Sequence, residues 1–282
     1  MDTKRLIVSG CFGVMLGSLT GPALAGQSPL CATLPGWAAL KSALAASITP
    51  STGPNGGLGN NMWGTIVAAD GTVCAVAFSG SDYTSQWLGS RVISAQKAST
   101  GNDFSLGNGS APGGSAFPTG LALSTANLYS AVQPGGSLYG LQHSNPVDTE
   151  VAYGNTDNGP VSPGTFGTRQ DPMVGLRVGG VNVFGGGFAA YQGGVRVGGV
   201  GVSGDTSCTD HMVGWRLRSR LGLDELGSVT GVSGDSKHPD NIIFDITPNP
   251  SGGTGISKGG FGHPTCLNNP TPAALSKLPA VQ

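Results

Sequence analysis

The segment 195–220, VRVGGVGVSGDTSCTDHMVGWRLRSR, decides the fold because it joins a strand to a helix through a glycine loop. Its apolar residues and glycines predict a strand over 195–203. A helix is predicted over 207–221, and its apolar residues fall on one side: Val213, Leu217 and Leu221. The segment therefore supplies one strand and one covering helix.

The start of this helix has the residues that helix N-termini prefer. Thr206 or Ser207 is a suitable N-cap, and Asp210 in the first turn complements the helix dipole. Near the other end, cations suit the dipole, so three arginines are expected to be solvated there: Arg216, Arg218 and Arg220. The simplest interpretation of 201–211 is therefore a capped helix start.

A hairpin is the clearest local signal elsewhere. In WGTIVAADGTVCAVAF (63–78), two apolar strands flank Asp70-Gly71, a pair that favours a type I′ turn. Two further strands are predicted at 176–184 and 187–191, and 241–246 is predicted to add one more.

Helices are predicted at 37–47, at 86–105 and from Ser124 to 133. In the second of these, Leu88, Val92, Ala95 and Ser99 form one face, whereas Trp87, Arg91 and Lys97 lie elsewhere. The strands cluster along the chain instead of alternating with helices, which favours an α+β fold with an antiparallel sheet.

The first 25 residues are expected to be a secretory signal peptide. Lys4 and Arg5 precede a short apolar stretch over 6–19, and Ala23-Leu24-Ala25 fits the rule for a cleavage site. We expect one domain over 26–226 with an irregular insertion at 107–173, which is a lid or another functional loop. An irregular extension follows at 227–282. A periplasmic or secreted location is expected.

Cysteine number agrees with export. Cys31, Cys74, Cys208 and Cys266 remain after the signal peptide, and an even number in an oxidising compartment predicts two disulfides, with three connectivities open. We favour Cys208–Cys266, which tethers the tail, and hence Cys31–Cys74. There is no C-x-x-C spacing, so a zinc site is a weaker alternative.

Composition excludes several classes of protein. The 50 glycines and 19 prolines suggest disorder, but charged residues are only 10% and the net charge is −1, which favours an ordered, turn-rich fold. With no basic stripe, nucleic acid is not an expected partner. No stretch reaches the roughly 20 apolar residues of a membrane span.

The segment 201–211 could hold a catalytic nucleophile, a nucleotide phosphate or another anion. The sequence Gly201-Val202-Ser203-Gly204-Asp205 lacks the last glycine of a nucleophile elbow, so a serine hydrolase using Ser203 with His238 or His263 is the weaker reading. A Walker loop is excluded because no lysine stands next to a Ser or Thr between 195 and 215. An anion site at the helix start suits a carboxylate or a phosphate.

Four segments carry a resemblance to a known family: SRVISAQKASTGNDFSL (90–106), LSTANLYSAVQPGGSLYGLQ (123–142), VGGVNVFGGGFAAY (178–191) and VGGVGVSGDTSCTDHMVGWRLRSRLG (197–222). They resemble the GlcG/HbpS-like family of haem-binding proteins, which is related to the C-terminal part of PduO-type proteins. The resemblance implies a profilin-like, three-layer α/β/α fold with an antiparallel sheet. It also implies a homo-oligomer and a tetrapyrrole ligand.

The short family members lack the SCTDH pairing, so an iron ligand has to be argued from this chain. Haem iron accepts His, Cys, Met or Tyr, and the cysteines are expected to be oxidised, which leaves the histidines. His211 is the first candidate ligand and metal site, and His143 is the second. His263 comes near if Cys266 pairs with Cys208. The other residues expected at the cofactor are Ser203, Gly204, Asp205, Phe184 and Lys97.

The leading hypothesis is an exported binding protein for haem or another anionic tetrapyrrole, rather than an enzyme. It depends on a hollow beside 195–211, where glycines let a cofactor approach the backbone. The alternatives are the hydrolase using Ser203 and a structural or accessory periplasmic protein.

Overall fold

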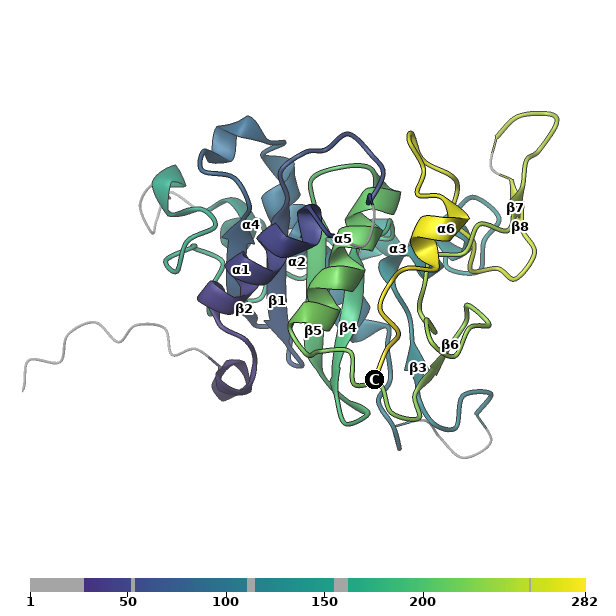
Figure 1. Ribbon diagram of the computed structural model, residues 1–282, viewed down its shortest axis with the longest axis horizontal. Coiled ribbons are helices and arrows are strands. Elements are labelled where there is room, and N and C mark those ends of the chain that lie inside the picture. Colours follow the sequence, from purple (N-terminus) through teal and green to yellow (C-terminus); the bar gives the residue numbers. More distant parts are fainter. Residues whose placement is uncertain (1–27, 52–53, 111–114, 155–161, 254) are drawn as a thin grey trace, which may run out of the picture.

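A computed structural model describes residues 28–51, 54–110, 115–154, 162–253 and 255–282, so the expected signal peptide lies outside the described residues. At its centre is a four-stranded antiparallel sheet with the order β2-β1-β5-β4 (Figure 1). The strands are β1 (Trp63–Ala68), β2 (Val73–Phe78), β4 (Gly187–Gln192) and β5 (Val195–Ser203). The predicted hairpin and the central strand 195–203 are confirmed.

Helices cover both faces of this sheet. On one face, α1 (Trp37–Ile48) and α5 (Ser207–Arg220) enclose an apolar cluster with side chains of all four strands. On the other face, α2 (Gly89–Asp103) packs on a second cluster around Trp63 and Val76. The three layers confirm the α+β, α/β/α architecture, and all three helices begin within three residues of the predicted positions.

The remaining elements are short. They are η1 (Pro29–Thr33), η2 (Tyr83–Ser85), β3 (Leu121–Ala122), η3 (Thr125–Leu128), η4 (Ser130–Val132), α3 (Leu141–Ser144), α4 (Thr149–Tyr153), η5 (Pro163–Thr165), β6 (Thr230–Gly231), β7 (Ile246–Thr247), β8 (Ile256–Ser257) and α6 (Pro272–Leu275). Ser124 does start a helix through a capping box with Asn127, but as two 3₁₀ turns instead of an α-helix.

Three local predictions are wrong. The segment 176–184 makes single bridges instead of a strand, because Gly179 and Gly180 adopt φ values of +64° and +78° that break an extended run. In 241–246 only Ile246 enters a strand. The hairpin turn is not type I′, because Gly71 has a positive φ of +82° whereas Asp70 does not.

The glycines of β5 bring the sheet and α2 into backbone contact. A Cβ on Gly199 would lie 2.1 Å from the Ala98 carbonyl oxygen, and one on Gly201 would lie 2.0 Å from that of Ser94. On the helix side of the same contact, Gly101 of α2 lies against the backbone of Phe188 in β4. Glycine is therefore required at these positions for close packing of helix on strand.

Three buried ion pairs join distant parts of the chain. Lys97 Nζ lies 2.7 Å from Asp210 Oδ2, and Arg91 and Arg218 make equivalent pairs with Asp171 and Asp240 at 2.5 and 2.6 Å. Arg216 and Arg218 were expected to be solvated, but both are buried, so that expectation is wrong. Arg216 Nε donates to Asn55 Oδ1 at 3.1 Å, and the three paired cations meet carboxylates more than twenty residues away in sequence.

Two disulfides confirm the favoured connectivity. Cys31–Cys74 ties η1 to β2, and Cys208–Cys266 ties the start of α5 to the tail. The tail also runs beside α5 (Figure 1), where Trp215 Nε1 donates to the Pro279 carbonyl at 2.9 Å. Within the described residues, no helix is both long and apolar enough to cross a membrane.

Replacement of Gly201 by alanine is expected to destabilise the fold by about 2 kcal/mol or more, because the new methyl group overlaps the α2 backbone. Gly89→Ala in the same helix–sheet layer is the control: its Cβ would meet only a side-chain methyl at 3.9 Å, so stability is unchanged or rises slightly. Urea denaturation of both variants measures the difference. Equal effects would contradict the close-packing account.

Candidate functional site

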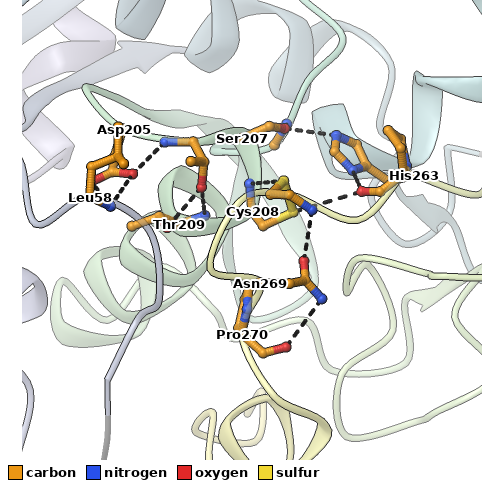
Figure 2. The surroundings of a disulfide bond; sticks show 12 residues. Leu58, Asp205, Ser207, Cys208, Thr209, His263, Asn269 and Pro270 are labelled. Carbon is orange, nitrogen blue, oxygen red and sulfur yellow. Dashed lines mark hydrogen bonds between the residues drawn. A yellow bond between two sulfur atoms is a disulfide. The ribbon is translucent and has the colours of Figure 1, made fainter.

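The loop between β5 and α5 is closed by hydrogen bonds. The Asp205 carboxylate accepts the backbone N–H groups of Leu58 (2.9 Å) and Asn60 (3.1 Å), as Figure 2 shows for Leu58. The Gly204 carbonyl accepts from the side chains of Asn60 and Gln86 at 3.0 and 2.8 Å. The expected N-cap, Thr206, is confirmed by its bond to the Thr209 N–H. The N–H groups of Thr206, Cys208 and Thr209, which were expected to meet an anion, donate instead to groups of the chain itself.

Beneath this loop lies the Lys97–Asp210 pair. Lys97 Nζ also donates to the Val202 carbonyl at 3.1 Å, and Asp210 Oδ1 accepts the Asp205 N–H at 2.9 Å. Burial raises the pKa of Asp210 to about 6, opposed by the charge and hydrogen bond of Lys97. Burial also lowers the pKa of Lys97, opposed by Asp210. Asp210 is therefore mostly ionised at neutral pH, and its carboxylate holds Lys97 inside the protein.

His211 lies on the inner side of α5 and is fully buried. Its Nε2 is 3.0 Å from Asn241 Oδ1 and 3.1 Å from the Ile242 N–H, and its ring lies 4.8 Å from that of Phe188. Burial lowers the pKa of His211 to about 3, and the charges of Arg218 and Lys97 act in the same direction. His211 is thus a neutral core imidazole.

The expected hollow at this junction is filled. A Cβ on Gly185 or Gly186 would meet a backbone carbonyl oxygen at 2.4 Å, and so would one on Gly204. Ser203 is buried, and Phe184 lies under Lys97 Nζ, 4.9 Å from the ring centroid. The arrangement brings most of the residues expected at the cofactor into one cluster, but it leaves no room there for a haem.

The four histidines occupy different surroundings. His143 is exposed on α3, and His238 is held by Asp235 at 2.7 Å and by the Leu278 carbonyl at 3.1 Å. His263 is buried and lies near α5, as expected from the Cys208–Cys266 bond. Of the two histidines predicted to serve Ser203 in a hydrolase, His263 contacts a different serine.

That serine is Ser207, the first residue of α5. His263 Nδ1 lies 2.6 Å from the Pro264 carbonyl and therefore donates to it, which leaves Nε2 to accept the Ser207 hydroxyl at 2.7 Å (Figure 2). Burial lowers the pKa of His263 to about 4. So weak a base is unsuited to activate a serine at neutral pH. The contact instead attaches the tail to α5.

A cavity of about 450 Å³ lies at another place, which we call the aromatic pocket. Trp37 from α1, Phe78 from the end of β2, Tyr83 from η2 and Phe166 after η5 line it. Its polar lining comprises Lys41, Ser81, Asp82 and Thr168. Its size is within the usual range of ligand sites, roughly 300–1,000 Å³.

The walls of the aromatic pocket are fixed by contacts. Trp37 Nε1 donates to the Gly167 carbonyl at 2.8 Å, and the Tyr83 and Phe166 rings meet edge to face at 5.7 Å. Arg91 stacks on Phe166 at 4.1 Å, so the buried Arg91–Asp171 pair supports this wall. Lys41 Nζ donates to the Phe78 and Gly80 carbonyls. Residues on four separate segments are thus held around one space.

Sequence reasoning missed this pocket. Its residues lie on segments about 40 and 80 residues apart, and none forms a known motif. The one available signal was the long insertion 107–173, which was expected to be functional and which supplies Phe166 and Thr168.

No family model matches the sequence, and no curated protein is similar to it. Solved structures do resemble it. The complex of PduOC with haem has 19% identity and a TM-score of 0.40, covering 66% of this chain and 93% of that chain. Protein ORFY of Klebsiella pneumoniae has 21% identity and a TM-score of 0.38, covering 73% and 98%. A double mutant of Streptomyces reticuli HbpS has 13% identity and a TM-score of 0.38, covering 78% and 99%.

PduO and HbpS are the proteins that the sequence resemblance named, so the structure search returned the same group. At this level of identity and overlap, the likeness carries no argument about the ligand.

Lys97→Met is expected to cost about 3–5 kcal/mol of unfolding free energy, because it leaves Asp210 buried without a cation. Adding Asp210→Asn should recover part of the loss, since the amide oxygen still accepts the Asp205 N–H. The exposed pair Arg177–Asp70 is the matched control, and Arg177→Met should cost less than about 1 kcal/mol. A Lys97→Met variant as stable as the control would show that the pair is dispensable.

The free energy of unfolding is expected to fall from pH 7 to pH 4.5 partly through His211. Its pKa of about 3 in the folded chain is below the ordinary 6.5, so the unfolded state binds the extra proton and stability is lost as pH falls below 6.5. His211→Asn should make this fall smaller by about 2–3 kcal/mol. The opposing effect of Asp210 is common to both proteins, and exposed His143→Asn is the control. Identical pH profiles would refute the buried neutral state.

Proposed function

We propose that this protein binds a planar, mostly apolar small molecule with an anionic edge, and that haem or a related tetrapyrrole is the first ligand to test. The observation that carries this proposal is the aromatic pocket, where four aromatic residues from separate segments surround about 450 Å³. Ligand sites are typically apolar clefts with a few polar groups that fix orientation, and this pocket has that composition.

The residues of the pocket suit such a ligand. Trp37 and Phe166 contribute aromatic surface that a flat molecule can contact. Tyr83 carries the only phenol among the pocket-lining residues, and a tyrosine oxygen is one of the ligands that haem iron accepts. Arg169 lies exposed over the Trp37 ring at 5.1 Å, where it can reach a carboxylate at the mouth. When bound, haem would supply redox or gas-binding chemistry; the chain supplies the slot and the charge.

Two further features are part of the proposal. Two disulfides suit an oxidising compartment, which supports the expected periplasmic or secreted location. A homo-oligomer, which the sequence resemblance implies, is also part of the proposal. The hydrolase alternative is not retained, because no described hydrogen bond joins Ser203 to a histidine.

The junction residues remain a second location for the same ligand. A haem on His211 would require the tail to leave α5 and break the bonds of His211 to Asn241 and Ile242. A haem on His143 would sit on an exposed helix. Both arrangements make predictions about histidine variants that differ from those of the aromatic pocket.

Titration of the mature protein with hemin, followed by the Soret band, tests the proposal. Binding at micromolar concentration is expected for the wild type. Trp37→Ala and Phe166→Ala should weaken it by about tenfold or more, which corresponds to roughly 1.4 kcal/mol for a lost ring contact. Tyr83→Phe should shift the band by changing the iron ligand. Trp87→Ala is the control, since this exposed indole lies outside the pocket.

The outcomes separate the two locations. Loss of binding in His143→Ala or His211→Asn, with the pocket variants unaffected, would move the site away from the pocket. Absence of any spectral change with the wild-type protein would reject haem as the ligand. The folded state of each variant is checked by circular dichroism.

A further inference from the structure

A second set of chemically reactive groups lies at the tethered end of the tail, outside the aromatic pocket. The Sγ atoms of Cys208 and Cys266 and a ring nitrogen of His263 all lie within 4.8 Å of one another. Cys208 is the second residue of α5, whereas the other two are on the tail loop, three residues apart. Figure 2 shows Ser207 and Cys208 at the start of α5, with His263 beside them.

Two sulfurs and an imidazole form a donor set that binds metal ions. Zinc in proteins takes Cys sulfur at about 2.3 Å and His nitrogen at about 2.0–2.1 Å, so ligand atoms around a tetrahedral ion lie about 3.5–3.8 Å apart. The atoms of the present cluster lie within 4.8 Å of one another, so shifts of about 1 Å bring them to these separations. What prevents binding is the Cys208–Cys266 bond, because a disulfide sulfur is not a thiolate ligand.

The surroundings favour thiolates once the bond is open. The Cys208 N–H lies 3.2 Å from Cys266 Sγ and donates to it, and Cys208 itself lies in the first turn of α5, where the helix dipole favours negative charge. Cys266 is partly exposed, so a reductant can reach it. His263 is oriented by the bond of its Nδ1 to the Pro264 carbonyl, as metal-binding histidines usually are by a carbonyl or carboxylate. Its Nε2 would exchange the Ser207 hydroxyl for the metal ion.

The tail stays in place without the disulfide. The Arg218–Asp240 pair holds it to α5 at 2.6 Å, and the Trp215 indole binds the Pro279 carbonyl. The His263 N–H donates to the Ile243 carbonyl at 2.8 Å, next to the contact of His211 with Ile242. Opening the bond therefore frees two sulfurs while the three groups remain together.

We propose that Cys208, Cys266 and His263 form a redox-gated binding site for a thiophilic metal ion, of which Zn²⁺ is the representative. A dithiol reductant gives two electrons and two protons to the disulfide and is itself oxidised to a disulfide. The two thiols then lose their protons as the metal ion binds. Solvent at the partly exposed Cys266 side completes the coordination, and reoxidation releases the ion.

The other disulfide provides a matched control. Cys31–Cys74 is reduced under the same conditions, but among the described residues the only group of three or more metal-binding side chains is Cys208, His263 and Cys266. Metal binding should therefore depend on one disulfide and not on the other.

The experiment is a Zn²⁺ titration of full-length mature protein against a chromogenic chelator, before and after reduction by a dithiol. We expect no binding by the oxidised protein and one ion per chain after reduction. The pair Cys208→Ser and Cys266→Ser should abolish binding, His263→Gln should weaken it by about tenfold or more, and Cys31→Ser with Cys74→Ser should leave it unchanged. Cobalt in place of zinc should give the visible absorption of a tetrahedral thiolate site.

The reduced and oxidised wild-type proteins have the same sequence, so their comparison does not depend on whether a variant folds. Circular dichroism establishes that the reduced protein remains folded. Failure of the folded, reduced wild type to bind Zn²⁺ would overturn the proposal, as would equal binding by the variant without Cys208 and Cys266. Neither result bears on the aromatic pocket, whose test uses hemin and oxidised protein.

Discussion

The direct packing of the α2 backbone on β4 and β5 is the constraint on which the rest of the structure depends. Gly199 and Gly201 on the strand and Gly101 on the helix have no side chains at the contact, so the two backbones meet at van der Waals distance. A helix held so close carries Lys97 past the end of β5 to Asp210 on α5. This close approach of α2 to β5 thus connects the two helical layers at the end of the inner strand β5.

This packing gives the glycine-rich segments a physical role. Glycines beside a strand end were interpreted as leaving space for a cofactor. In the structure, neighbouring backbone fills the space beside these glycines. Three of the buried cations, Lys97, Arg91 and Arg218, are each compensated by one carboxylate because an unpaired buried charge is costly. One of these pairs, Arg91–Asp171, supports the wall of the aromatic pocket through Phe166. A buried ion pair of the core therefore helps to hold the wall of the proposed ligand pocket.

Local patterns predicted the elements well where the chain follows a simple period. The hairpin 63–78 and the run 195–220 have apolar runs bounded by turn residues, and the cysteine number predicted two disulfides. Local patterns did not predict the surroundings of a side chain whose partner lies far away in the sequence. Lys97 looks like a solvated helix residue until Asp210, 113 positions later, is placed beside it. His263 pairs with Ser207 instead of Ser203 for the same reason: the disulfide, not the motif, sets its position.

The sequence by itself determined an α+β chain with an antiparallel sheet, its central strand, its three main helices and an even set of cysteines. These follow from periodicity and turn chemistry, which act over a few residues. Only the tertiary structure decided which charges are buried, that the strand–helix junction is solid, and that Trp37, Phe78, Tyr83 and Phe166 surround a cavity. Such features arise where segments far apart in the chain come into contact, and local sequence patterns do not predict those contacts.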